Sequence, residues 1–217
     1  MFDLIATLPG TPAVSKQQTV ILPAVSQLVF TNPPQSVVAG ACSAALQLQT
    51  RDAGGTATPV QAATSILLSS NQAGVAFFSD AACATALPGS TLLLGAGADS
   101  GTFHVRATST LPTTLTATLA PLTPTNQALG VTAGPAIKLA FATSAQGLPA
   151  GGCSSPVRVE TRDTNDNLAP VSTASPVTLA TTGVVVSLYS DPACTTAISA
   201  PLPLAAGGSA IIFYFRG

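Results

Sequence analysis

The sequence predicts an all-β protein made of tandem β-sandwich repeats. Three observations lead to this prediction. The chain matches itself at a fixed offset, its apolar residues alternate with polar ones in several segments, and it contains eighteen glycines and eighteen prolines. Alternation at period two is typical of strands buried on one face, and so many helix-breaking residues argue against long helices.

The repeat is clearest at the cysteines, because the spacing from Cys42 to Cys83 equals that from Cys153 to Cys194. We call the shift that carries Cys42 onto Cys153 the repeat offset. Matches at this offset are dense along the chain, which indicates two copies of one unit. The matched segments are Phe30 with Phe141, Gly40 with Gly151, Thr50–Asp52 with Thr161–Asp163, Pro59-Val60 with Pro170-Val171, and Ser79-Asp80 with Ser190-Asp191.

The repeat divides the chain into three parts. Residues 1–26 match the end of a repeat, because Leu115–Leu119 falls on Leu4–Leu8, and they are expected to form a terminal hairpin plus linker. Residues 27–134 form a complete repeat. Residues 135–217 form a second repeat that lacks its last two strands. We therefore expect either a piece of a longer array or a chain whose open repeat is completed by another molecule.

Each complete repeat holds about seven to nine short strands in roughly 110 residues, which is the size of an immunoglobulin-like sandwich. Clusters of Gly, Pro, Asn and Asp separate the strands. The expected strands are Gln27–Thr31, Ala44–Thr50, Ser65–Ser69, Gly74–Phe78, Thr91–Leu94, Gly101–Ser109, Thr113–Ala120, Gln127–Ala133 and Pro156–Thr161.

The four cysteines allow three pairings. The repeat favours Cys42 with Cys83 and Cys153 with Cys194, since each copy must fold alone. We expect Cys42 to open a strand and Cys83 to lie in a loop. Disulfides indicate an oxidising compartment, hence an extracellular or cell-surface protein. A zinc site is the alternative, but the spacing fits no CxxC pattern and His104 is the one histidine.

Charged residues make up only 7% of the chain, and the net charge is −1. This balance gives no electrostatic basis for binding nucleic acid or an acidic membrane surface. The segment 195–215 carries no charge, but two prolines and two glycines interrupt it, so no membrane span is expected.

The matched segments around the cysteines resemble one type of repeat. Gly40–Ser43 with Phe78–Cys83, and Gly151–Ser154 with Tyr189–Cys194, are similar to the immunoglobulin-like repeats of large bacterial surface and secreted proteins, of the invasin/intimin and filamin-like kind. The resemblance covers nearly the whole chain. It implies a stalk, spacer or adhesive module and supplies no catalytic residues.

The segment 163–170 also resembles the calcium linker of cadherins. Its Asp163, Asn165, Asp166 and Asn167 carry oxygens of the kind that calcium prefers. The first copy keeps only the first Asp and the Pro, the segment lies inside a repeat, and Glu160 is the chain's one glutamate. A hairpin turn is therefore favoured over a calcium site.

No catalytic group stands out, so we expect no enzyme and no cofactor. His104 is matched by Tyr214 in the second copy, which favours packing over acid–base chemistry. The segment Gly95–Gly101 is glycine-rich but lacks the ending of a phosphate loop, so a plain loop is expected. Asp80 and Asp191, each just before a second cysteine, are expected to cap a turn beside the disulfide.

These features favour a structural or adhesive repeat module of a bacterial cell-surface or secreted protein. Its partners would be other copies of itself or neighbouring repeats, with a glycan or a host or cell-surface protein as further candidates. Head-to-tail completion by strand addition would make a filament, whereas a simple fragment would leave a sheet edge exposed. A carbohydrate-binding sandwich is the alternative, although Tyr189 and Tyr214 are the only tyrosines and tryptophan is absent from the sequence.

Overall fold

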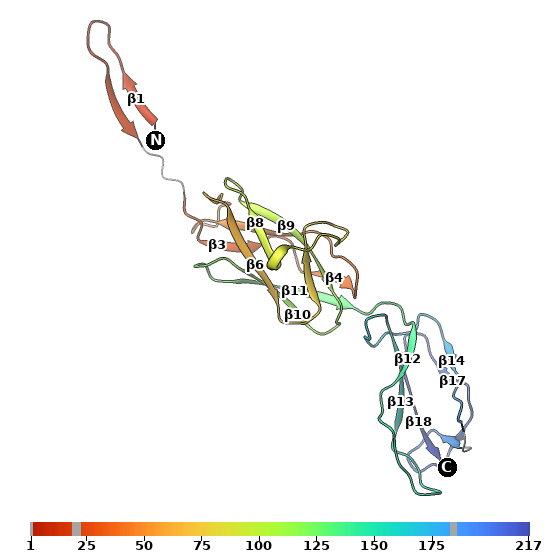
Figure 1. The fold of residues 1–217 in the computed structure, drawn as a ribbon. Helices are drawn as coiled ribbons and strands as arrows, with labels where there is room; N and C mark the ends of the chain where they lie inside the picture. The colour runs from red at the N-terminus through yellow and green to blue at the C-terminus, as the bar shows by residue number, and fades with distance from the viewer. Residues whose placement is uncertain (1, 19–22, 183–185) are drawn as a thin grey trace.

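A computed structural model describes residues 2–18, 23–182 and 186–217 of the chain. It is all-β, as the sequence predicts. A two-stranded hairpin, a first sandwich and a second sandwich follow one another in a row, and the two termini lie at opposite ends of the molecule (Figure 1). The described residues contain no helix that is long and apolar enough to cross a membrane.

The first sandwich, formed by residues 27–132, packs a five-stranded sheet against a four-stranded one. In the five-stranded sheet the order is β4 (Gln35–Val38), β11 (Thr125–Thr132), β10 (Thr113–Thr118), β6 (Thr64–Ser70) and β8 (Thr91–Leu94). In the four-stranded sheet it is β3 (Gln27–Phe30), β5 (Leu46–Arg51), β9 (Ser100–Ala107) and β7 (Val75–Phe78). A short 3₁₀ turn, η1 (Pro88–Ser90), precedes β8.

The core of the first sandwich follows from strict alternation along its strands. In β5 and β10 every second residue is buried, so each strand presents one face to the opposite sheet. Sixteen described hydrophobic residues form this core, with Phe103 packed between Phe30 and Phe77. Thr50 is also fully buried, and its hydroxyl donates to the Thr58 carbonyl, so its burial leaves no donor unsatisfied.

The second sandwich, formed by residues 138–216, has one larger sheet and a much smaller opposing one. The larger sheet runs β12 (Lys138–Phe141), β13 (Val157–Arg162), β18 (Ala210–Arg216), β15 (Ser187–Tyr189) and β16 (Ala197–Ile198). The opposing sheet consists of β14 (Ser175–Val177) and β17 (Leu202–Leu204). The repeat offset carries the first residues of β3 and β5 onto those of β12 and β13, and both pairs are antiparallel. The larger sheet therefore corresponds to the four-stranded sheet of the first sandwich.

The two cores differ in size because the opposing sheets differ. Seven described hydrophobic residues form the second core, against sixteen in the first. The difference is visible at positions related by the repeat offset. Leu28 is 4% exposed, whereas its counterpart Leu139 is 54% exposed.

The N-terminal hairpin joins β1 (Phe2–Ala6) to β2 (Val14–Gln18) in antiparallel register. Its described side chains belong to neither sandwich core, and Leu4, Ile5, Leu8 and Val14 are all exposed. A hairpin thus stands where the sequence places one. The linker positions 19–22 lie outside the described residues.

The expected strands all correspond to strands in the structure, and their ends shift by a few residues. Sequence reasoning named no strand at β4, nor at β12 and β14–β18 of the second sandwich. The expectation that Cys42 opens a strand was wrong. Cys42 forms an isolated bridge with Arg106 on β9, and β5 begins only at Leu46.

Candidate functional site at the sandwich junction

Each sandwich carries a disulfide at the equivalent end. Cys42 pairs with Cys83 and Cys153 with Cys194, with Cα–Cα distances of 5.7 and 5.8 Å. The first cysteine of each pair also forms a bridge to β9 or to its counterpart β18, through Arg106 or Arg216. In each sandwich, therefore, the disulfide ties the loop that follows β7 or β15 to the end of the sheet.

One aspartate organises the loop around each second cysteine. The Asp80 carboxylate accepts hydrogen bonds from the N–H groups of Ala82, Ala84 and Thr85. Asp191 accepts equivalent bonds from Ala193, Thr195 and Thr196. Both aspartates thus cap a turn, as the sequence predicts. These bonds, the one from Thr196 foremost, lower the pKa of Asp191 to about 2.

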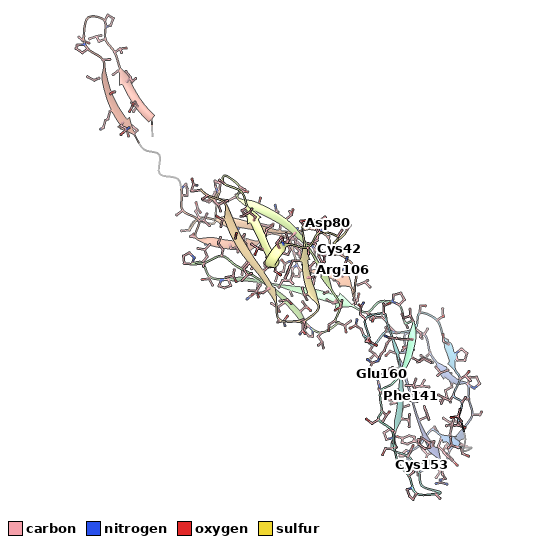
Figure 2. All side chains as sticks on the ribbon, viewed as in Figure 1. Cys42, Asp80, Arg106, Phe141, Cys153 and Glu160 are labelled. Carbon is pink, nitrogen blue, oxygen red and sulfur yellow. A yellow bond between two sulfur atoms is a disulfide. The ribbon has the colours of Figure 1, made fainter. Side chains whose placement is uncertain are left out.

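An arginine and an aromatic ring complete this arrangement, which we call the clasp. The Arg106 guanidinium lies 5.0 Å from the centre of the Phe78 ring and donates to the Cys83 carbonyl. Arg216 lies in the same way 5.6 Å from Tyr189. Figure 2 shows Cys42, Asp80 and Arg106 gathered at one end of the first sandwich, and Cys153 at the far end of the second.

The end of the first sandwich that carries the clasp faces the loop Asp163–Asn167 of the second sandwich. We call this contact the junction. At its centre is Asp163, which is only 1% exposed. Its Oδ2 accepts the N–H of Gly134 in the connecting segment at 2.9 Å. Its Oδ1 accepts the N–H groups of Asn165 and Asn167 at 2.8 and 2.9 Å. One carboxylate thus fixes both the loop and the connection that leads into it.

Burial of the Asp163 carboxylate raises its pKa, but the hydrogen bonds reverse that effect. The Asn167 side chain and the N–H groups of Gly134, Asn167 and Asn165 all donate to it, so its pKa lies below the usual range. The carboxylate is therefore charged in the junction, and its charge is balanced by N–H dipoles.

Asn167 carries the contact across to the first sandwich. Its Nδ2 donates to the Thr108 carbonyl at 2.8 Å, and its Oδ1 accepts the Thr110 N–H at 3.1 Å. Beside it, a methyl group at Gly40 would stand 3.0 Å from Asn165 Nδ2, and Gly40 has a φ of +83°. Glycine is favoured there by both the close approach and the backbone conformation.

The structure corrects one sequence-based argument. The segment Asp163–Asn167 lies inside the second repeat in sequence, but in space it lies between the two sandwiches. The sequence contained one sign of this contact. At the position of Asn167 in the second repeat, the first repeat has Thr56. An asparagine amide has separate donor and acceptor atoms, so it can bond to two backbone groups at once. The shorter threonine side chain does not extend as far from the backbone.

The four calcium candidates are held by different partners. Asp163 and Asn167 bond to each other at 3.0 Å, Asn165 lies against Gly40, and Asp166 pairs with Lys138 at 2.7 Å. No group of three or more His, Cys, Asp or Glu within the described ranges could hold a metal ion. The sequence favoured a turn over a calcium site here, and the calcium alternative stays untested.

The remaining candidates have structural contacts. His104 Nδ1 lies 3.0 Å from the Ser43 carbonyl, beside the clasp. The residues Gly95–Asp99 form the loop that leads into β9, as expected for a plain loop. Tyr189 and Tyr214 are directly opposite each other on β15 and β18, and Arg216 covers Tyr189. A carbohydrate platform built on these tyrosines would therefore be partly occupied by a protein side chain.

Comparison of the sequence with family models and with curated proteins gives no match. Among solved structures, domains 4 and 5 of the S-layer protein SbsC match with a TM-score of 0.38 and 15% identity, over 56% of this chain and 59% of that one. SbsC domains 4–9 match with a TM-score of 0.39 and 17% identity, over 95% and 29%.

A glycosyl hydrolase family 2 member from Bacteroides cellulosilyticus DSM 14838 matches with a TM-score of 0.37 and 15% identity. That match covers 57% of this chain and 17% of the other. The chain thus spans less than two thirds of the length of the first structures it matches.

Proposed function

We propose that the chain is a structural repeat module of a bacterial cell-surface or secreted protein, in which consecutive sandwiches are joined end to end. The single observation that carries this proposal is the junction. Asp163 and Asn167 bond to the connecting segment and to the preceding sandwich, so successive units are held in one orientation. A spacer or stalk needs this property, because freely jointed units would collapse into a coil.

Two further features support an extracellular module. One disulfide closes each sandwich, which suits an oxidising compartment. The sequence also resembles the immunoglobulin-like repeats of bacterial surface proteins. The polar groups at the clasp and junction bond to protein atoms, so we assign no catalytic role to them.

Substituting Asn167→Ala tests the junction directly. It removes both bonds to the first sandwich, together with the donation from Asn167 to Asp163, and Asn167 belongs to neither core. We expect faster hydrogen exchange at the Thr110 amide, and a broader distribution of maximum dimensions in small-angle X-ray scattering. The matched control is Thr56→Ala, at the same place in the first sandwich, where the side chain is exposed. Unchanged exchange and scattering in the Asn167 variant would remove the basis of the proposal.

A further inference from the structure

The outward face of the larger sheet in the second sandwich carries most of the chain's basic side chains. The sequence holds seven lysines and arginines in all. Four of them lie on the outward sides of β12, β13 and β18, and we call the face formed by these strands and β15 the basic face. Its four cations are Lys138, Arg158, Arg162 and Arg216.

Alternation and register place these cations close together. Along β13 every second residue is buried, so Arg158, Glu160 and Arg162 point outward in a row. Lys138 of β12 lies directly opposite Arg162, and residues that are directly opposite share one face of the sheet. Three cations and one glutamate thus form a contiguous cluster on two neighbouring strands.

The next strand, β18, adds apolar and aromatic groups to the cluster. Ile212 lies directly opposite Arg158 and is 54% exposed. Tyr214 and Arg216 follow it at alternate positions, so they lie on the same face. Arg158 and Arg216 are therefore four residues apart along the sheet, which is about 13 Å, and Tyr214 lies between them.

Glu160, labelled in Figure 2, holds the two arginines of β13 in place. Arg158 donates from Nε to its Oε1 and Arg162 donates from Nη2 to its Oε2, both at 2.7 Å. These bonds, the one from Arg158 foremost, lower the pKa of Glu160 and keep its carboxylate charged. The bond from Arg158 uses Nε, and the side chain is 40% exposed. The N–H groups on its terminal nitrogens are therefore available to a further acceptor.

The first sandwich shows that the fold itself does not need these charges. Three charged residues of the basic face, at β12 and β13, fall on glutamines at the repeat offset: Gln27, Gln47 and Gln49. The strands pair in the same register in both sandwiches. Lys138 opposite Arg162 is a like-charge pair, which destabilises a sheet, and the carboxylates of Glu160 and Asp166 offset the repulsion. A cluster that contains such a pair, and that the other repeat does without, indicates a role other than stability.

The plan of the first sandwich leaves the corresponding face uncovered. There the chain continues from β9 into β10, which belongs to the opposite sheet. Gln47, Gln49 and His104, on the outward side of the four-stranded sheet, remain partly exposed. A continuation of the second sandwich on the same plan would likewise leave the basic face accessible.

We propose that the basic face binds an anionic polysaccharide, one that carries acid groups at intervals along its chain. The Arg158 guanidinium donates to one acid group, because its planar fork matches the oxygens of such a group. Tyr214 and Ile212 pack against the sugar beside it, since tyrosine offers an apolar ring together with a hydroxyl. Arg216 takes a second acid group further along the polymer. Two cations on either side of one aromatic ring suit a polymer better than a single small anion.

A polysaccharide is favoured over a nucleic acid because the basic face is short. The other three cations, Lys16, Arg51 and Arg106, lie in the hairpin and in the first sandwich. They therefore do not extend the basic face into a long stripe of the kind that follows a phosphate backbone. The identity of the ligand, though not the existence of the face, also rests on the proposed extracellular role.

Biolayer interferometry on the full chain tests the proposal. The immobilised probes are alginate, dextran sulfate, neutral dextran and a single-stranded DNA. We expect the chain to bind alginate, dextran sulfate or both, to lose affinity as the salt concentration rises, and to leave neutral dextran unbound. A preference between the first two probes identifies the acid group as carboxylate or sulfate. Binding to neither acidic polysaccharide, or equal binding to the DNA, would overturn the proposal.

Two substitutions that copy the first sandwich locate the site. Arg158→Gln and Tyr214→His introduce the residues found at the equivalent positions, so we expect both variants to fold, as circular dichroism can verify. Each should weaken binding to the preferred acidic polysaccharide by roughly tenfold, through a lost charged hydrogen bond or a lost ring contact. Lys16→Gln, on the hairpin, is the matched control. It removes the same charge and should change the affinity little.

Equal losses of affinity in Arg158→Gln and Lys16→Gln would show an effect of net charge alone and would refute the site. Unchanged binding in both Arg158→Gln and Tyr214→His would refute it as well. Arg158 and Tyr214 take part in none of the junction bonds named above, and Asn167→Ala leaves both of them in place. Polysaccharide binding and the junction can therefore be refuted separately.

Discussion

The clasp shows how a single carboxylate organises a loop that has little else to hold it. Around Asp80 and Asp191 the backbone turns sharply, and Cys83 and Cys194 adopt positive φ angles of 51° and 52°. Few L-residues favour this conformation. Three backbone N–H groups satisfied by each aspartate, and the disulfide itself, keep the cysteine in place.

Because of the clasp aspartates, the stability of the folded state should depend on pH in the acidic range. A carboxyl with a lower pKa in the folded state stabilises the fold above its unfolded pKa, which is near 3.9. That stability is lost as the pH falls towards the folded pKa, about 2 for Asp191. We therefore expect the melting temperature of the second sandwich to fall between about pH 4 and pH 2.

The variant Asp191→Asn isolates this contribution. It should lower the melting temperature near neutral pH and flatten the decline at acidic pH, because an amide cannot gain the proton. The measurement is differential scanning calorimetry at a series of pH values. Asp3→Asn, on the exposed hairpin, is the control and should follow the wild type. An acid profile in the Asp191 variant as steep as that of the wild type would contradict the assignment.

At the scale of elements, the same hairpin pattern occurs once inside a sandwich and once outside. The buried β10 contributes Leu115 and Ala117 to a core, whereas β1 presents Leu4 and Ala6 to solvent. The stability that a strand contributes therefore depends on what lies beneath it, and not on its sequence alone.

A pair of substitutions at equivalent positions of the two hairpins measures this difference. Leu115→Ala should lower the free energy of unfolding of the first sandwich by about 2–5 kcal/mol, as cavity-forming substitutions do in cores. Leu4→Ala should leave the unfolding of a monomeric chain unchanged. Urea denaturation at low protein concentration gives both values. If Leu4→Ala destabilised the monomer comparably, the hairpin would have to pack on a sandwich in cis.

Strand positions could be predicted because apolar and polar residues alternate in a strand that is buried on one face. This holds for β5, β6 and β9, whose local patterns are clear. Strand β4 carried no such pattern, because it is only four residues long and buries a single side chain, that of Val37. The junction was missed for another reason. The turn at Asp163 is local and was expected. The side-chain amide of Asn167, however, bonds to Thr108 and Thr110, and only the folded chain brings these residues close to it.

At the scale of the molecule, two sandwiches share one plan and differ in how much core they bury. Both disulfides close loops with a sequence separation of 41 residues. In the chain-entropy model each stabilises its sandwich by roughly 4 kcal/mol. The second sandwich has fewer than half as many buried core residues, so that same contribution is a larger share of its stability.

Reduction should therefore unfold the second sandwich before the first. We expect the double variant Cys153→Ser with Cys194→Ser to expose the second sandwich to limited proteolysis, with cleavage sites read by mass spectrometry. The matched variant Cys42→Ser with Cys83→Ser should keep a protease-resistant first sandwich, because its core remains covered on both sides. Equal protease sensitivity of the two variants would mean that the smaller core costs the second sandwich little stability.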